Sequence, residues 1–192
     1  MIAFPLGRRT ELTVEEYFAL AADSEISHEF YEGEIIARTG IQRDHIMITG
    51  NVMGQLHIQL TNRAECIALA STMRVRVSDT IYFYPDGLAV CDARFADPDE
   101  YTLTNPCLVV EVTSESTAMY DRLTKLAAYR QMPSVQEILI VDQYRVAIEQ
   151  HTRVPEGWLV REFTEPDEKI LLESLGCTLA VSDVYAKVTF EA

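Results

Sequence analysis

A glutamate interrupts one of the most apolar stretches of the sequence. Glu111 lies inside residues 107–113, Cys-Leu-Val-Val-Glu-Val-Thr, whose β-branched residues are typical of a strand buried on both faces. A charged carboxylate is costly in such surroundings unless a cation or a hydrogen-bond donor lies beside it. The sequence therefore predicts a central strand of a covered sheet, together with a group that compensates the charge of Glu111.

A second carboxylate stands where another apolar run begins. Asp86 lies in the step Pro85-Asp86-Gly87, directly before the apolar residues Leu88 to Cys91. Alone, this step is a common turn signal, whereas two carboxylates at the ends of strands are the hard oxygen ligands that Mg²⁺ or Mn²⁺ prefers. We therefore regard Asp86 and Glu111 as candidate metal ligands, with the backbone carbonyl of Val112 as a third.

Size and composition indicate one ordinary folded domain. The chain has 192 residues, of which 48% are hydrophobic and 24% charged, and both values are typical of globular proteins. No apolar stretch approaches the roughly 20 residues of a membrane span, and the segment Met1 to Arg9 lacks the layout of a signal peptide. We expect a cytoplasmic protein that does not enter a membrane.

The four cysteines show no metal-binding spacing. Cys66, Cys91, Cys107 and Cys177 form no CxxC pair, and three of them lie in apolar, strand-like surroundings. Free cysteine in such surroundings behaves as a small hydrophobic residue. We therefore predict buried reduced thiols rather than a zinc site or a disulfide framework.

The net charge of the chain opposes nonspecific binding to nucleic acid. Its value is −14 at pH 7, and phosphate binding is driven by lysine and arginine. A nucleic-acid site would therefore need a local basic patch. The candidates for phosphate contacts are Arg74 and Arg76, which alternate on one predicted strand, and Arg122 and Arg130, on or beside a predicted helix. Scattered surface charge is the competing explanation.

The order of the predicted elements indicates a single α/β or α+β domain around a mixed sheet. A capping box at Thr13 to Glu16 opens a short helix that ends near Ala22, and apolar spacing predicts a long helix over 42–60. The hydroxyl-rich segment 113–117 suits an N-cap, and a helix is expected from there over 118–131, stopped by Met132-Pro133. The predicted hairpin covers 28–37, and strands are expected near 68 and at 73–77, 81–84, 88–91, 107–113, 137–141, 145–150 and 158–163. We divide the domain 1–192 into a helix and hairpin at about 10–38, a core at about 42–150 that holds the candidate site, and C-terminal strands at 151–192.

Three residues of the helix at 118–131 share one face. Asp121, Lys125 and Tyr129 are spaced by four. If this face packs near the end of the Glu111 strand, Lys125 could orient or deprotonate a water molecule beside a bound metal. The competing explanation is a solvated lysine in a weak helical pair with Asp121. We interpret Tyr129 as a packing residue whose hydroxyl is satisfied by the site.

Together these residues resemble the Uma-type restriction endonuclease family, a branch of the PD-(D/E)XK nuclease superfamily. The resemblance covers about residues 10–185. It rests on Asp86 in a Pro-Asp step, Glu111 in Val-Glu-Val, and a set of further positions: Tyr17, the segment 28–34, His45, Ser114, Ser116, Asp121, Lys125 and Tyr129. It implies a restriction-endonuclease-like αβββαβ core and Mg²⁺-dependent cleavage of DNA. It also implies a homodimer or higher oligomer, since one active site cuts one strand of double-stranded DNA.

The family also suggests roles for single residues. Asp86 and Glu111 would bind the metal, and Lys125 would be the catalytic lysine, moved to the helix because Thr113 occupies the lysine position of the ExK motif. Glu29 would bind a second metal or hold a water of the first, and His45 would meet a phosphate or orient Glu29.

Two other functions fit the same residues. The absent ExK lysine and the −14 charge favour a non-catalytic binding or assembly module that keeps the nuclease fold. The carboxylate pair also suits the acid and base of a glycosidase, although Trp158 is the only tryptophan available for a sugar platform.

Overall fold

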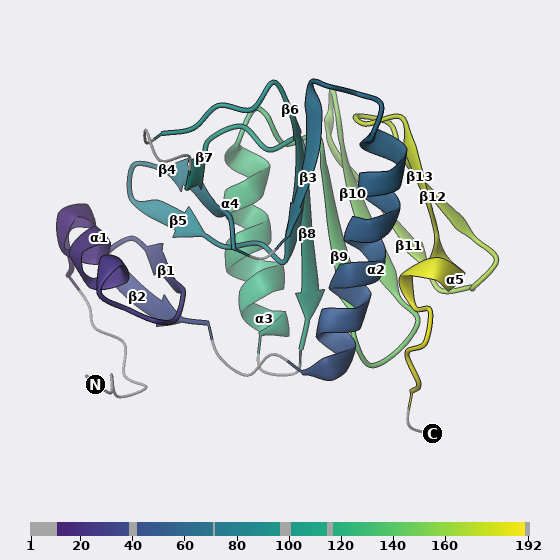
Figure 1. The fold of residues 1–192 in the computed structure, drawn as a ribbon, viewed down its shortest axis with the longest axis horizontal. Coiled ribbons are helices and arrows are strands. Elements are labelled where there is room, and N and C mark those ends of the chain that lie inside the picture. The colour runs from purple at the N-terminus through teal and green to yellow at the C-terminus, as the bar shows by residue number, and fades with distance from the viewer. Residues whose placement is uncertain (1–10, 39–41, 71, 97–100, 115–116, 191–192) are drawn as a thin grey trace.

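The computed structural model describes residues 11–38, 42–70, 72–96, 101–114 and 117–190. Its centre is a six-stranded mixed sheet in the order β11-β10-β9-β8-β6-β3, which stands in the middle of Figure 1. Strands β8 and β9 are parallel, and the other neighbours are antiparallel. The bounds are Cys66–Ala70 (β3), Gly87–Cys91 (β6), Leu108–Thr113 (β8), Glu137–Asp142 (β9), Ile148–Val154 (β10) and Gly157–Phe163 (β11).

Helices cover both faces of this sheet. Successive side chains of a strand point to opposite faces, so each strand contributes to both helix-covered layers. On one face Val110 and Val112 pack in a cluster with residues of α2 (Arg43–Leu60). On the other face Val109 packs in a cluster with Tyr129. Tyr129 belongs to the helix at 118–131, which consists of α3 (Ala118–Tyr120), the π-helical segment η1 (Asp121–Lys125) and α4 (Leu126–Gln131). Glu111 lies on the same face of β8 as Val109 and therefore faces this second helix. The predicted mixed sheet flanked by helices is confirmed.

A second sheet extends the side of the molecule that carries the N-terminal elements. It has five strands in the order β2-β1-β5-β4-β7. Helix α1 (Val14–Ala22) packs on its outer face through Tyr17, Phe30 and Tyr82, and the predicted capping box is present. Phe83 points to the opposite, inner face and joins the cluster of Val109 and Tyr129. The bounds are His28–Tyr31 (β1), Glu34–Ala37 (β2), Arg74–Ser78 (β4), Ile81–Phe83 (β5) and Thr102–Leu103 (β7).

The C-terminal part differs most from the sequence expectation. The strand expected at 145–150 begins at Ile148 and runs to Val154, so the boundary placed at residue 150 falls inside β10. A hairpin of β12 (Lys169–Leu172) and β13 (Cys177–Ala180), followed by α5 (Val181–Val184), packs in the cluster of α2; the hairpin was not predicted. No helix of the described ranges is long and apolar enough to cross a membrane.

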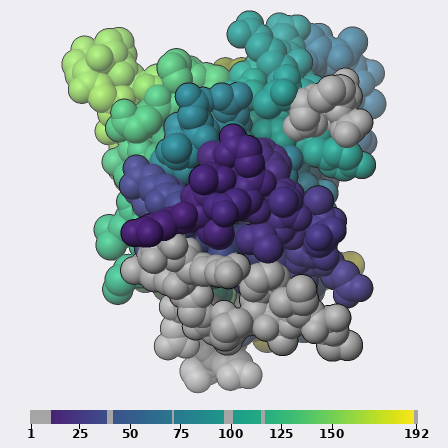
Figure 2. Space-filling view, turned by 90° about the vertical axis from the view of Figure 1, so that its left-hand side faces the viewer, coloured from purple at the N-terminus to yellow at the C-terminus, as the bar shows by residue number. Residues whose placement is uncertain are grey.

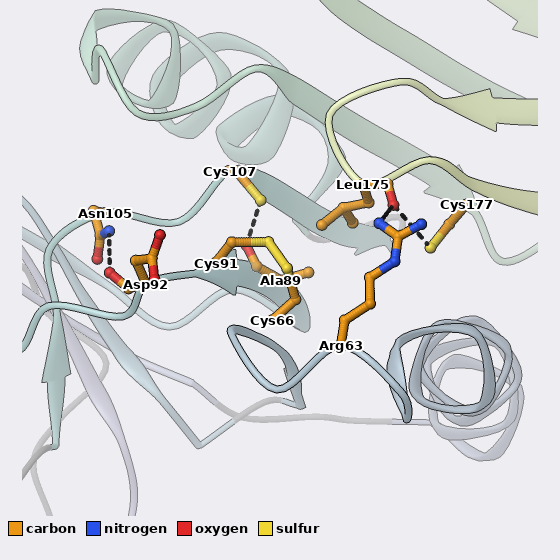
Figure 3. Close-up of a disulfide and its surroundings, with 9 residues drawn as sticks. All are labelled: Arg63, Cys66, Ala89, Cys91, Asp92, Asn105, Cys107, Leu175 and Cys177. Atoms are coloured by element: carbon orange, nitrogen blue, oxygen red, sulfur yellow. Dashed lines mark hydrogen bonds between the residues drawn. A yellow bond between two sulfur atoms is a disulfide. The ribbon is translucent and has the colours of Figure 1, made fainter.

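Two cysteines form a disulfide, so the prediction of four reduced thiols was wrong. Cys66 of β3 and Cys91 of β6 are direct cross-strand partners and are bonded to each other, as Figure 3 shows. Cys107 and Cys177 are free, and Cys107 Sγ lies 3.3 Å from the Ala89 carbonyl oxygen. Sequence spacing did not reveal the pair because it depends on the register of two strands that are distant along the chain.

Candidate active site

Asp86 and Glu111, the two candidate metal ligands, lie next to each other at one end of the central sheet. Gly87 of β6 pairs with Val110 of β8, so the same register places Asp86 opposite Glu111. Both residues are almost fully buried, with 3% and 2% of their surface exposed. Burial of two acidic groups at adjacent positions requires compensation, which the surrounding elements supply.

Three donors hold Asp86. The Val112 N–H donates to Oδ2 at 2.8 Å, while Arg38 Nη2 and His45 Nε2 lie 2.6 and 3.1 Å from Oδ1. Burial alone would raise the pKa of Asp86, but the hydrogen bond and charge of His45, with the charges of Lys125 and Arg38, hold it below its usual range. Asp86 is therefore an ionised carboxylate.

Val112 also presents its carbonyl to this end of the sheet. In a strand, the N–H and C=O of one residue point to the same side. Since the Val112 N–H reaches Asp86, its C=O faces the same edge, beyond the beginning of β6. The predicted third ligand therefore lies on the side of the strand where Asp86 stands.

Lys125 occupies the space between the acidic groups. Its Nζ lies 2.7 Å from Glu111 Oε1, 3.0 Å from Glu29 Oε1 and 3.7 Å from Asp121 Oδ1. Only 3% of Lys125 is exposed, so the alternative of a solvated helix lysine is wrong. Tyr129 packs in the core, and its hydroxyl donates to Glu111 Oε1 at 2.8 Å.

Burial and neighbouring charges shift the pKa values of Glu111 and Lys125. Burial raises the pKa of Glu111 to about 8, with Lys125 opposing the rise and Asp86 adding to it. Burial would lower the pKa of Lys125, but the charges of Glu111 and Glu29 outweigh it and raise that pKa well above the usual value. Lys125 is consequently an ammonium group, while Glu111 holds a proton for much of the time at neutral pH.

The five-stranded sheet contributes the third acidic side chain. Glu29 of β1 accepts the Tyr84 N–H at 3.0 Å and lies against Lys125 on the inner face of that sheet. Asp121 adds a fourth, and burial raises its pKa. Four acidic side chains thus surround two permanent cations, Arg38 and Lys125.

A π-helical segment places two of these residues. Asp121–Lys125 has the wider π turn, and the Leu126 N–H donates to the Asp121 carbonyl, five residues before it. This turn directs Asp121 and Lys125 toward the strand that carries Glu111. Single π turns inside α-helices are often found at functional sites.

The basic residues chosen as phosphate contacts lie elsewhere. Arg74 and Arg76 stand on β4 of the five-stranded sheet, whereas Arg122 pairs with Glu149 and Arg130 with His151 of β10. Ser114 lies at the helix entrance, where its carbonyl accepts the Thr117 and Ala118 N–H groups. Ser116 and the segment Met1 to Arg9 lie outside the described residues.

Sequence reasoning missed two members of the site. Arg38 is an isolated basic residue after the hairpin, and no local pattern predicts its contact with Asp86. Tyr120 has a buried hydroxyl without a hydrogen-bond partner in the described part of the chain, and the charges of Glu29, Lys125, Glu111 and Asp121 all act on it. Tyr120 directly precedes Asp121 in the sequence and is partly exposed, and no sequence pattern indicates that its hydroxyl belongs to the site.

The comparison with known proteins decides the family. The family model Uma2, described as "Putative restriction endonuclease", matches residues 14–182. The chain belongs to the Uma2 family. Two uncharacterized Synechocystis proteins are similar to this Uma2 protein: sll1609 is 32% identical over 162 residues, which cover 83% of this chain and 91% of the relative. The second, slr1290, is 30% identical over 182 residues, which cover 94% of each chain.

A solved structure shares the fold. The crystal structure described as a putative nuclease belonging to DUF820, from Anabaena variabilis, superimposes with a TM-score of 0.75 and 17% identity, covering 93% of this Uma2 chain and 99% of the other. At this identity the likeness concerns the fold. It confirms the expected nuclease-like architecture.

Proposed function

We propose that this Uma2 protein is a Mg²⁺- or Mn²⁺-dependent endonuclease that hydrolyses phosphodiester bonds of double-stranded DNA. The observation that supports the proposal is the convergence of Asp86, Glu111 and Lys125 at one buried point, with the ammonium 2.7 Å from Glu111. The three residues come from a loop, a strand and a helix, and no packing requirement explains three buried ionisable groups there.

The ligand set would be Asp86, Glu111 and the Val112 carbonyl. Within the described ranges, no three or more His, Cys, Asp or Glu side chains are grouped to hold a metal ion, so a backbone group has to complete a set based on two carboxylates. The donors fit, because hard oxygens suit Mg²⁺, the four acidic side chains outnumber the two cations, and the Tyr120 hydroxyl needs a partner such as a metal-bound water. A bound metal would lower the pKa of a water ligand and neutralise charge on the phosphate.

Lys125 would act as a charged donor rather than as a base. Its pKa is raised by Glu111 and Glu29 against the effect of burial, so the ammonium can hold the attacking water or a phosphate oxygen. Asp86 is ionised and its pKa is lowered, so it would not readily accept a proton from the attacking water. Glu29 lies beside Lys125 and could orient that water. His45, 3.1 Å from Asp86, would keep that carboxylate in place.

A specific observation supports the rival, a non-catalytic binding or assembly module. Arg38, His45 and the Val112 N–H already bind both oxygens of Asp86. A module that keeps the fold for binding alone would retain this arrangement without a metal. In an endonuclease, Mn²⁺ would displace Arg38 from Asp86, whereas in a non-catalytic module Arg38 would stay bound to Asp86.

Nicking of a supercoiled plasmid with Mg²⁺ or Mn²⁺ tests the proposal. We expect Asp86→Asn and Lys125→Met to abolish nicking, while the exposed controls Asp167→Asn and Lys169→Met keep it. Circular dichroism would show that each variant is folded, and Lys125→Arg should retain part of the activity.

Nicking that persists in both site variants contradicts the assignment. A wild-type protein that neither nicks nor binds Mn²⁺ in calorimetry supports the non-catalytic module. Light scattering measures the mass in solution, and a monomer that still makes double-strand breaks would contradict the proposed homodimer.

A further inference from the structure

A second site lies on the outer face of the five-stranded sheet, away from the acidic cluster. A pocket of about 370 Å³ is lined there by Phe18, Arg74, Arg76, Tyr82, Tyr101 and Thr102, with Ala96. Figure 2 shows the side of the molecule on which α1, in purple, lies against the blue-green strands of this sheet. The residues between Ala96 and Tyr101, which include the acidic Asp97, Asp99 and Glu100, lie outside the described residues.

The composition of this pocket differs from that of the rest of the chain. Acidic residues outnumber basic ones by 30 to 16, yet the described lining contains two guanidinium groups and no carboxylate. Three aromatic rings accompany the two arginines. A concave surface that combines positive charge with aromatic rings fits a ligand that is both anionic and aromatic.

Strand pairing and α1 fix one half of the pocket. Arg74 Nε and Nη2 donate to Thr102 Oγ1 at 2.9 and 2.7 Å, and its guanidinium carbon lies 4.5 Å from the centre of the Phe18 ring. The Phe18 and Tyr82 rings meet edge to face, with 5.2 Å between their centres. This half of the pocket is therefore built before any ligand arrives.

The other half of the pocket is more exposed. The side chain of Arg76 is 40% exposed, and its ion-pair partner in the described part of the chain is Asp79, whose side chain is 88% exposed. An ion pair so exposed contributes little, so a phosphate could replace Asp79. Tyr101 lies at the rim, and 67% of its surface is exposed.

We propose that this pocket binds one nucleotide unit, with the base stacked on Tyr101 and the phosphate held by Arg76. Aromatic side chains stack on bases of any sequence, and arginine binds phosphate oxygens through paired N–H groups. The unit belongs either to a single-stranded part of the nucleic acid or to a free nucleotide, which offer the same chemistry. In the first case the inference rests on the proposed endonuclease function and adds a holding point for an unpaired strand.

Tyr84 links the pocket to the acidic cluster. Its hydroxyl lies 3.5 Å from Arg74 Nη1, and its backbone N–H donates to Glu29. Because Arg74 and Tyr82 lie on the outer face and Glu29 on the inner face, the nucleotide in the pocket would not be the one that is cleaved. It would belong to a flanking part of the strand.

Fluorescence anisotropy in EDTA tests the pocket without cleavage. The probes are a labelled single-stranded oligonucleotide, a labelled blunt duplex of the same sequence, and dAMP as competitor. We expect Tyr101→Ala and Arg76→Ala each to weaken single-strand binding about ten-fold, with little change for the duplex. Tyr101→Phe should bind normally, and Arg161→Ala, which removes an exposed charge on β11, serves as control.

The outcomes separate the two sources and the two proposals. Displacement of the oligonucleotide by dAMP at similar concentration indicates a free-nucleotide site, and displacement only by longer strands indicates the substrate strand. Equal binding by all variants, equal losses for duplex and single strand, or selective binding of phosphotyrosine overturns the proposal. A protein that cleaves DNA but shows no effect of Tyr101→Ala would refute the pocket alone, and one that binds but never cleaves would refute the endonuclease alone.

Discussion

Glu111→Gln should remove most of the pH dependence of stability between about pH 5 and pH 8. Burial raises the pKa of Glu111 from 4.5 to about 8, so the folded protein holds this proton more tightly than the unfolded chain does. A carboxyl group with a raised pKa contributes stability that is fully present below the unfolded value and is lost as the pH rises through the folded value. Wild-type protein should therefore lose stability across this window, and the neutral glutamine should not.

The structure sets the size of the effect. The two pKa values lie about 3.5 pH units apart, and each unit corresponds to about 1.4 kcal/mol, so the loss is at most about 5 kcal/mol. Asp121, whose pKa is also raised by burial, acts in the same direction. Asp86 acts in the opposite direction, because its pKa is below the ordinary value and its contribution is lost only in stronger acid.

Urea unfolding followed by circular dichroism, at several pH values and in EDTA, measures this dependence. Glutamine keeps the size of the side chain and an oxygen that can accept from Lys125 and Tyr129, so the fold should survive. Glu156→Gln, on the exposed turn between β10 and β11, is the matched control and should follow the wild type. The raised pKa of Glu111 would be contradicted if the free energy of unfolding changed equally with pH in the wild type and in Glu111→Gln, or if the wild type were more stable at pH 8 than at pH 5.

Three other variants test separate parts of the structure. Lys125→Met should cost about 3–5 kcal/mol of unfolding free energy at neutral pH, because it leaves buried carboxylates unpaired, and less in mild acid; a loss no larger than that of Lys169→Met would contradict this. Arg38→Met should tighten Mn²⁺ binding in calorimetry about ten-fold, since it removes the cation that occupies Asp86, whereas the exposed control Arg43→Met should not. Thiol titration of unreduced, unfolded protein should find two thiols, and the Cys66→Ser/Cys91→Ser variant should lose about 3 kcal/mol because the bond closes a loop of 25 residues; four thiols without reductant would rule the bond out.

Local patterns were sufficient for the elements that build the core. The apolar spacing of α2 and the β-branched run of β8 predicted both structures, because each pattern records which faces are buried. Glu111 stood out for the same reason, since a charge within a two-sided strand needs a partner. The fourfold spacing of Asp121, Lys125 and Tyr129 then indicated which helix face would supply it.

Contacts between distant segments gave no such signal. The Arg38 contact with Asp86 joins residues 48 positions apart, and the disulfide depends on the register of β3 against β6. Sequence patterns also did not separate the five-stranded sheet from the six-stranded one. The pocket around Arg74 follows from that division, because α1 and β7 reach β4 only when the second sheet forms.

The exchange of Thr113 for the expected lysine has a geometric explanation. Residues 111 and 113 lie on the same face of β8, so a lysine at 113 would point toward the helix beside Glu111. Here Thr113 is 3% exposed and its hydroxyl donates to the Val141 carbonyl at 3.4 Å, which uses the position for holding β8 to β9. The helix supplies the ammonium instead, because its π turn brings Lys125 Nζ within 2.7 Å of Glu111. A cation placed by either element would act on the same carboxylate, so the altered motif by itself is no argument against catalysis.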